Sequence, residues 1–185
     1  ENVPGEDATV VVSTAILENN PELREAKRRG LTIVHRAQML AKLGEGLDTL
    51  AVAGTHGKTT TSSMLAHTMD ALGLSPTFLV GGIVRSYYVV EADESDKSFT
   101  YLSPAAVIVT NIEADHLDHY SGLDEIYRKF REFIASVPDS GPVVVCADDA
   151  SLVETARSAG KNVITYGFSS ESDALIESAE PNGVG

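Results

Sequence analysis

A short segment of the sequence, residues 54–61, has the residue types needed to bind a phosphate group. It reads Gly-Thr-His-Gly-Lys-Thr-Thr-Thr and follows a short apolar run. The two glycines allow backbone N–H groups to turn toward phosphate oxygens, and the N-terminus of a following helix adds partial positive charge. Lys58 supplies a cation for the β- and γ-phosphates, and the Thr59 hydroxyl is placed to bind Mg²⁺. The alternative is a helix-capping turn that happens to contain lysine and threonine, but the strand–loop–helix context favours a phosphate loop.

Four carboxylates cluster directly after a second apolar run, residues 87–90, and they are Glu91, Asp93, Glu94 and Asp96. Carboxylates this close repel one another unless a cation or solvent compensates. Ligands of open α/β sheets bind outside the carboxyl ends of the strands, so we expect this group on the same side as the phosphate loop. The sequence therefore predicts a Mg²⁺ ion held by a carboxylate and by nucleotide phosphates, with a solvated acidic turn as the alternative.

A third group of metal-capable side chains follows the apolar run at residues 105–110. His116 offers a neutral imidazole, and Asp115 or Asp118 would orient it. Taken alone, an Asp-His pair is more often a surface hydrogen bond than a metal site. Because three strand ends carry side chains suited to nucleotide or metal chemistry, we favour a metal site here as well.

Short β-branched runs alternate along the chain with stretches of helical periodicity, which is the pattern of a parallel sheet covered by helices. Strands are predicted at 8–12, 31–34, 49–53, 77–80, 87–91, 105–110, 143–146 and 163–166, and helices at 21–29, 36–43, 59–72, 123–137 and 151–158. We therefore expect an α/β fold with a mostly parallel sheet and flanking helices. Glycines at 44 and 46 predict a domain boundary between residues 1–45 and 46–185. The polar tail from Ser169 predicts no further element.

The charge balance excludes some classes of partner. The 14 basic and 27 acidic side chains give a net charge of −13. Contacts with nucleic acids and anionic membranes depend on lysine and arginine, so we expect neither as a partner and expect any bound phosphate to be held locally. No stretch approaches the roughly 18 apolar residues of a membrane helix. The single Cys146 cannot form an internal disulfide, which fits a reducing, cytoplasmic compartment.

Three segments, residues 54–61, 91–96 and 110–118, together resemble the motifs of the Mur ligase family. The resemblance implies a P-loop-type ATP-binding domain at 46–185, incomplete here. It also implies that residues 1–45 are the end of a Rossmann-like, UDP-binding N-terminal domain, and that the family's C-terminal domain is absent. The residues implied to hold the ATP phosphates are Gly54, Thr55, His56, Gly57, Lys58, Thr59 and Thr60.

The same resemblance implies a reaction and assigns roles in it. Lys58 would contact the γ-phosphate, and Thr59 and Glu91 would bind one Mg²⁺ ion. His116 would bind a second, which makes Lys58, Glu91 and His116 the predicted catalytic residues. The reaction is ATP-driven amide formation, in which a substrate carboxylate takes the γ-phosphate and an amine attacks the acyl phosphate. The members that this sequence resembles most join UDP-N-acetylmuramate to L-alanine in peptidoglycan synthesis. Two cations and a lysine would offset the repulsion between carboxylate and phosphate.

Two other functions stay open at this point. A murein-tripeptide recycling ligase has a similar phosphate loop, although Ser95 and the run at 111–116 favour the L-alanine-adding members. A nucleotide-binding switch would hydrolyse ATP without joining two substrates. Because the family's site is assembled between domains, we expect this chain by itself to be inactive.

Overall fold

The computed structural model describes residues 3, 5, 7–78, 87–114 and 119–180. The chain forms two compact units, Glu1–Glu45 and Gly46–Gly185. Each unit has a parallel sheet of its own, and the described residues contribute two strands to the first sheet and seven to the second. Among the described residues, no helix combines the length and the apolar character needed to cross a bilayer.

The first unit is a small βαβα arrangement. In chain order its elements are β1 (Thr9–Val12), α1 (Pro21–Arg28), β2 (Thr32–His35) and α2 (Arg36–Leu43). The strands pair in parallel, with Thr9 opposite Thr32. Helix α1 begins at a proline, and the Asn20 side chain accepts hydrogen bonds from the first backbone N–H groups at 2.9 and 3.1 Å. Both features satisfy the start of a helix, where backbone donors have no intrahelical partner.

The second unit is built around a parallel sheet with the strand order β4-β5-β3-β6-β7-β8-β9. All neighbouring strands in this sheet run parallel. The elements in chain order are β3 (Asp48–Ala53), α3 (Lys58–Ala71), β4 (Thr77–Phe78), β5 (Tyr87–Glu91), the 3₁₀ helix η1 (Ser98–Tyr101), β6 (Ala106–Val109), α4 (Leu123–Ala135), β7 (Val143–Cys146), α5 (Ala150–Ser158), β8 (Val163–Gly167) and β9 (Ala174–Leu175). The predicted α/β class with a mostly parallel sheet is confirmed.

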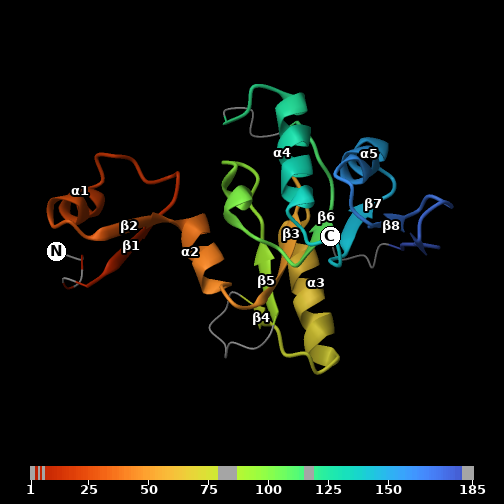
Figure 1. Cartoon of the computed structure of the whole chain (residues 1–185), viewed down its shortest axis with the longest axis horizontal. Helices are drawn as coiled ribbons and strands as arrows, with labels where there is room; N and C mark the ends of the chain where they lie inside the picture. Colours follow the sequence, from red (N-terminus) through yellow and green to blue (C-terminus); the bar gives the residue numbers. More distant parts are fainter. Residues whose placement is uncertain (1–2, 4, 6, 79–86, 115–118, 181–185) are drawn as a thin grey trace. The chain divides into compact units, whose positions relative to one another are not determined.

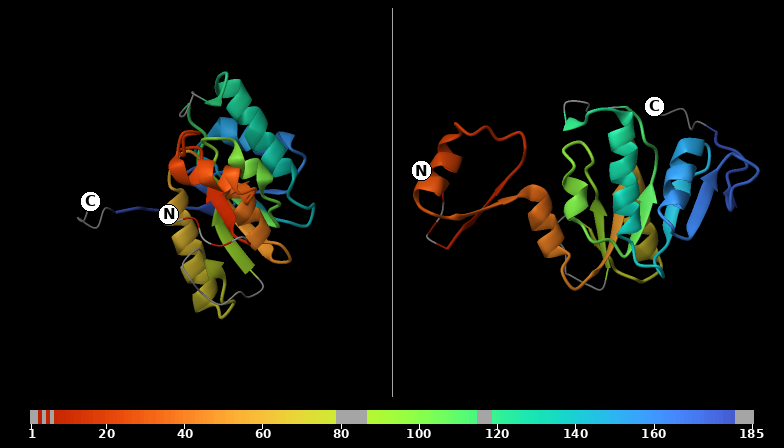
Figure 2. Two further views of the ribbon diagram at one scale, coloured as in Figure 1. Left: turned by 90° about the vertical axis from the view of Figure 1, so that its left-hand side faces the viewer. Right: turned by 45° about the horizontal axis from the view of Figure 1, so that its top comes forward.

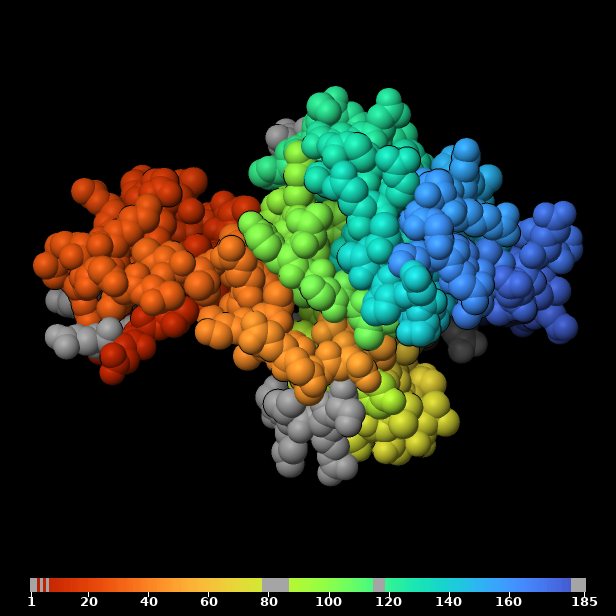
Figure 3. All heavy atoms as spheres, viewed as in Figure 1, coloured from red at the N-terminus to blue at the C-terminus, as the bar shows by residue number. Residues whose placement is uncertain are grey.

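Helices cover the sheet and close its core. Helix α3 contacts β3 and β5, and α5 contacts β7 and β8. Helices α4 and α5 are in contact, lie side by side in Figure 1 and in the right view of Figure 2, and their atoms adjoin in the space-filling view (Figure 3). Continuous β-branched runs suit such a sheet because its strands are shielded from water by helices. The core side chains with at most 1% exposure include Val107, Val109, Val143, Val145, Phe130, Ile134 and Leu152.

Two elements were not predicted from the sequence. The prediction that the tail from Ser169 forms no element was wrong, because β9 pairs with β8 through Tyr166 opposite Ala174. The Asp173 carboxylate fixes this tail by accepting hydrogen bonds from the Thr165 backbone N–H and hydroxyl, both at 2.8 Å. A two-residue strand and a four-residue 3₁₀ helix are too short to produce a hydrophobic period.

The predicted strand at 77–80 is observed at Thr77–Phe78, and its remaining residues lie outside the described part of the chain.

The 3₁₀ helix η1 fixes the acidic segment, residues 91–96, to α4. The Phe99 ring packs against Phe130 and Phe133 of α4, with ring centroids 5.2 and 4.9 Å apart. Just before η1, the Lys97 ammonium donates to the Glu125 carboxylate of α4 at 2.7 Å. The residues that follow β5 are therefore held by an apolar contact and an ion pair at once.

Glu125 makes the stability of this contact depend on pH. The Lys97 hydrogen bond, followed by the Ser121 backbone and hydroxyl bonds, lowers the pKa of Glu125 from 4.5 to about 2. A lowered pKa means that the charged form stabilises the fold above pH 4.5, and that this contribution is lost as the pH falls toward 2.

We expect Glu125→Gln to lower the free energy of unfolding at pH 7, because the neutral amide cannot form an ion pair with Lys97. The difference from the unmodified protein should shrink between pH 4.5 and about 2, measured by denaturant unfolding at several pH values. Asp124→Asn removes a neighbouring exposed charge and serves as the control. A difference that stays constant across this range would contradict the role assigned to Glu125.

Candidate functional site

Parallel pairing brings the ends of three strands together. β3 lies between β5 and β6, with Val52 opposite Glu91 and Ala53 opposite Val109. The pairing continues past the strands, since the Ala92 N–H donates to the Val52 carbonyl at 2.9 Å. The phosphate loop, the acidic segment and the residues after β6 therefore emerge at one edge of the sheet, where ligands of open α/β sheets bind.

The loop between β3 and α3 depends on its two glycines. Gly54 has φ +132° and Gly57 has φ +82°, which are backbone conformations that other residues rarely adopt. A Cβ atom on Gly54 would also lie 2.1 Å from the Thr110 hydroxyl and about 3 Å from the Asn111 backbone. Gly57 is the N-cap of α3, so the loop leads directly into a helix N-terminus. This is the backbone geometry that a phosphate loop requires.

Thr110 and Asn111, which follow β6, hold the loop at His56. The Thr110 hydroxyl donates to the His56 carbonyl at 2.6 Å, and the Asn111 side chain bonds both the His56 carbonyl and its N–H, at 3.2 and 2.9 Å. The Thr55 N–H donates to the Asn111 carbonyl at 3.1 Å. Both residues belong to the motif at 110–118, but the sequence assigned neither of them a role. The available signal was their position at a third strand end beside two others that carry phosphate and metal chemistry.

Lys58 lies across its own loop. Its ammonium donates to the Gly54 and Thr55 carbonyls at 2.6 and 3.2 Å and to the Glu94 carboxylate at 2.8 Å. The Glu94 side chain is 5% exposed and that of Lys58 18%, so the ion pair is largely buried. Burial raises the pKa of Glu94, and the hydrogen bond from Lys58 opposes that rise. Lys58 therefore compensates the negative charge of Glu94, one of the four clustered carboxylates.

Glu91 has hydroxyl partners instead. It accepts hydrogen bonds from Thr59 at 3.2 Å and from Ser62 at 3.4 Å, and in the described part of the chain no lysine or arginine pairs with it. Two adjacent oxygen ligands of an octahedral Mg²⁺ ion stand about 3 Å apart. The Thr59 and Glu91 oxygens fit this spacing without a change of position, so the residues present suit a hard cation.

The third predicted metal ligand, His116, lies outside the described residues, as do Asp115 and Asp118. Among the residues that are described, no group of three or more His, Cys, Asp or Glu side chains is arranged to hold a metal ion. The described residues on either side of this segment do contact the site. The Glu113 N–H donates to the Thr55 hydroxyl at 2.9 Å, and the buried Tyr120 hydroxyl donates to the Glu94 carbonyl.

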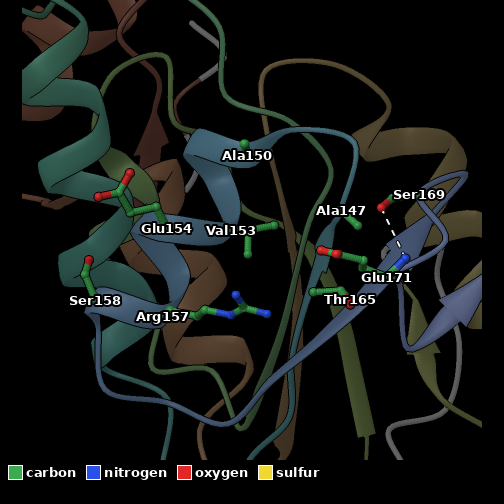
Figure 4. A pocket seen from close by; sticks show the side chains of 9 residues that line it. All are labelled: Ala147, Ala150, Val153, Glu154, Arg157, Ser158, Thr165, Ser169 and Glu171. Carbon is green, nitrogen blue, oxygen red and sulfur yellow. Dashed lines mark hydrogen bonds between the residues drawn. The ribbon is translucent and has the colours of Figure 1, made fainter.

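A separate hollow lies beside α5, away from the phosphate loop. It has a volume of about 520 Å³ and is bordered by α5 and by residues around β8 and the turn after it (Figure 4). Arg157 is the basic residue of its lining, and Glu154 and Glu171 are acidic. Because two carboxylates accompany one guanidinium, the hollow has no excess of positive charge for a polyphosphate. The loop at residues 54–60 is therefore the better phosphate site.

Comparison with known proteins identifies the family. Residues 84–182, more than half of the chain, match the Mur ligase middle domain, and residues 1–46 match the model described as the Mur ligase family, catalytic domain. The chain belongs to the Mur ligase family. The resemblance noted in the sequence is thus confirmed.

Two curated relatives of this Mur ligase chain carry the same name. It is 43% identical over 187 residues to the UDP-N-acetylmuramate–L-alanine ligase of Carboxydothermus hydrogenoformans. The alignment covers 95% of this chain and 40% of the relative. The enzyme of that name from Paracoccus denitrificans is 42% identical, and its alignment covers 100% of this chain and 41% of the relative. The chain therefore spans about 40% of the length of the curated relatives it matches.

Solved Mur ligase structures share the fold. UDP-N-acetylmuramate-alanine ligase from Thermotoga maritima superposes with a TM-score of 0.73 at 30% identity, covering 86% of this chain and 38% of that one. UDP-N-acetylmuramate:L-alanyl-gamma-D-glutamyl-meso-diaminopimelate ligase from Neisseria meningitides gives a TM-score of 0.74 at 27% identity, covering 85% and 58%. Both support the α/β fold described above.

We expect Gly54→Ala to disrupt the loop, because its Cβ would clash with a Thr110 hydroxyl that hydrogen bonds already hold. The free energy of unfolding should fall by about 1–3 kcal/mol, and MgADP affinity, measured by calorimetry, should fall by at least about tenfold.

Gly160→Ala is the matched control, since Gly160 also has a positive φ of +73°, but no atom of the described residues lies within 4 Å of the position that a Cβ would take. It should cost stability without changing nucleotide affinity. Equal effects of the two substitutions on nucleotide affinity would contradict the clash as the cause.

Proposed function

We propose that the protein of which this chain is part is an ATP-dependent ligase that joins L-alanine to UDP-N-acetylmuramate through an acyl phosphate, in peptidoglycan synthesis. The observation that carries the proposal is the glycine loop with Lys58 directly beside the Thr59–Glu91 oxygen pair. A polyphosphate needs backbone donors and a lysine, and its Mg²⁺ needs a hydroxyl and a carboxylate. Both sets of groups lie at one edge of the sheet.

In this proposal the chain binds and orients ATP. Residues 54–60 hold the phosphates through backbone N–H groups and the N-terminus of α3, while Lys58 contacts the β-phosphate, which ADP also carries, and the γ-phosphate. Thr59 and Glu91 hold Mg²⁺, which when bound neutralises phosphate charge as a carboxylate approaches. Glu91 suits this role better than Glu94, because its described partners are hydroxyl groups whereas Glu94 already has a lysine.

His116 is proposed as the ligand of a second Mg²⁺ ion. The support is the family motif at 110–118, together with the contacts of Glu113 and Tyr120 to the phosphate loop and the acidic segment. We further propose that residues 1–45 are the end of the UDP-binding N-terminal domain and 46–185 part of the ATP-binding domain. A cytoplasmic location is proposed because the reaction consumes ATP.

The proposed substrates rest on the relatives. Four curated relatives named UDP-N-acetylmuramate–L-alanine ligase are 42–44% identical to this chain. Among the solved structures, the alanine ligase from Thermotoga maritima is 30% identical and the tripeptide ligase from Neisseria 27%. The tripeptide-recycling ligase is therefore the second candidate. The amine or peptide that supports ATP turnover distinguishes the two.

The deciding experiment measures phosphate release by the full-length protein, omitting UDP-N-acetylmuramate and L-alanine in turn. We expect release only when both are present, and Lys58→Ala should reduce it at least about 100-fold because the γ-phosphate loses its cation. Release that needs neither substrate would contradict the ligase and favour a nucleotide switch.

Two further variants make the Lys58 result interpretable. Lys58→Ala leaves Glu94 buried without its cation, which costs about 3–5 kcal/mol of stability. The double variant Lys58→Ala/Glu94→Gln removes that charge and should be folded but equally inactive. Lys129→Ala, on α4, should release phosphate at the unmodified rate.

We expect Glu91→Gln to raise the Mg²⁺ concentration needed for half-maximal activity by about tenfold, because an amide is a weaker ligand of a hard cation than a carboxylate. Activity is titrated with Mg²⁺ at saturating ATP. Glu132→Gln removes a half-exposed carboxylate on α4 and should leave the titration unchanged. An unchanged titration for Glu91→Gln would reassign the metal to another carboxylate of the acidic segment.

A further inference from the structure

The Lys58 ammonium has all of its hydrogen-bond donors in use. A lysine has three N–H donors, and here the acceptors are the Gly54 carbonyl, the Thr55 carbonyl and the Glu94 carboxylate, at 2.6, 3.2 and 2.8 Å. A phosphate oxygen that bonds to this ammonium must therefore replace one of these acceptors. Among the three, Glu94 is the anion, so it competes most directly with a phosphate for the same cation.

The backbone of Glu94 is held by hydrogen bonds, and its side chain is buried. The residue is 4% exposed, and its carbonyl accepts hydrogen bonds from the Tyr120 hydroxyl and from the Lys97 N–H, the latter at 3.0 Å. Its second carboxylate oxygen, Oε1, is buried and has no hydrogen-bond partner among the described residues. The carboxylate therefore depends on Lys58, and any loss of that contact leaves a buried charge poorly compensated.

We propose that Glu94 is a positioning residue that holds Lys58 across the loop and opposes transfer of its ammonium to nucleotide phosphate, so that this ion pair sets the phosphate affinity of the loop. The inference rests on the proposed nucleotide-binding function of residues 54–60. It gives the buried ion pair a function beyond stability, since a loop that binds its nucleotide less tightly releases the product faster.

The test compares MgADP binding by the full-length protein and its Glu94→Gln variant, using isothermal titration calorimetry. Glutamine has the same length and can still accept a hydrogen bond from Lys58, but it lacks the competing charge. We expect the dissociation constant to fall by about tenfold. A purely structural role predicts the opposite, a lower melting temperature with weaker binding. Glu132→Gln, the same change at a half-exposed carboxylate on α4, should alter the constant less than about twofold.

A double-mutant cycle assigns the effect to the pair. In the Lys58→Ala background there is no ammonium for which Glu94 and the phosphate compete. Glu94→Gln should therefore change the dissociation constant less than about twofold. An equal tightening in both backgrounds would overturn the proposal and indicate a general effect of charge. Glu94→Asp keeps the charge but draws it back by one methylene, so it should tighten binding by a smaller factor and provides a second variant if the glutamine protein does not fold.

Separate results would refute nucleotide binding by the loop and the role of Glu94. If the unmodified protein binds no MgADP under any condition tested, the proposed function of the loop is wrong. If it binds MgADP and Glu94→Gln binds equally or more weakly, the nucleotide loop stands and the role of Glu94 is overturned.

Discussion

The site depends on the parallel register of β5, β3 and β6. Because these strands run in the same direction, with Val52 opposite Glu91 and Ala53 opposite Val109, the residues after each strand emerge at one edge of the sheet. Val52 and Val109 are fully buried, so a shift of register would disturb the core as well as the site. The contacts of the phosphate loop with the acidic segment and with Thr110 and Asn111 follow from this pairing.

In and near residues 91–96, individual partners compensate several carboxylates. The net charge is −13, yet within and near the acidic segment Glu94 is paired with Lys58, and Glu125 with Lys97. Asp93 accepts hydrogen bonds from the Ser95 N–H and hydroxyl. Glu91 is left with hydroxyl partners, which makes it the carboxylate suited to a cation. The acidity that argues against nucleic-acid binding is thus, in this region, a set of defined contacts around a phosphate loop.

The main elements of the fold could be predicted from the sequence because each is marked by local signals. The run at 143–146 and the helix at 36–43 have the predicted bounds, and the phosphate loop lies between a strand and a helix as expected. Strand β9 was missed because two residues have no period, and its position depends on the Asp173–Thr165 contact. Local spacing also could not separate Glu91 from Glu94, since both are carboxylates in the same short segment.

The sequence by itself determined the alternation of strands and helices, the glycine loop with Lys58 and Thr59, and the motifs that place the chain in the Mur ligase family. Only the tertiary structure decided which side chains meet. Asn111 holds His56 across 55 positions of sequence, and Lys58 pairs with Glu94 across 36. The physical reason is that backbone preferences and glycine geometry act within a few residues, whereas burial and charge compensation depend on which strands become neighbours in the sheet.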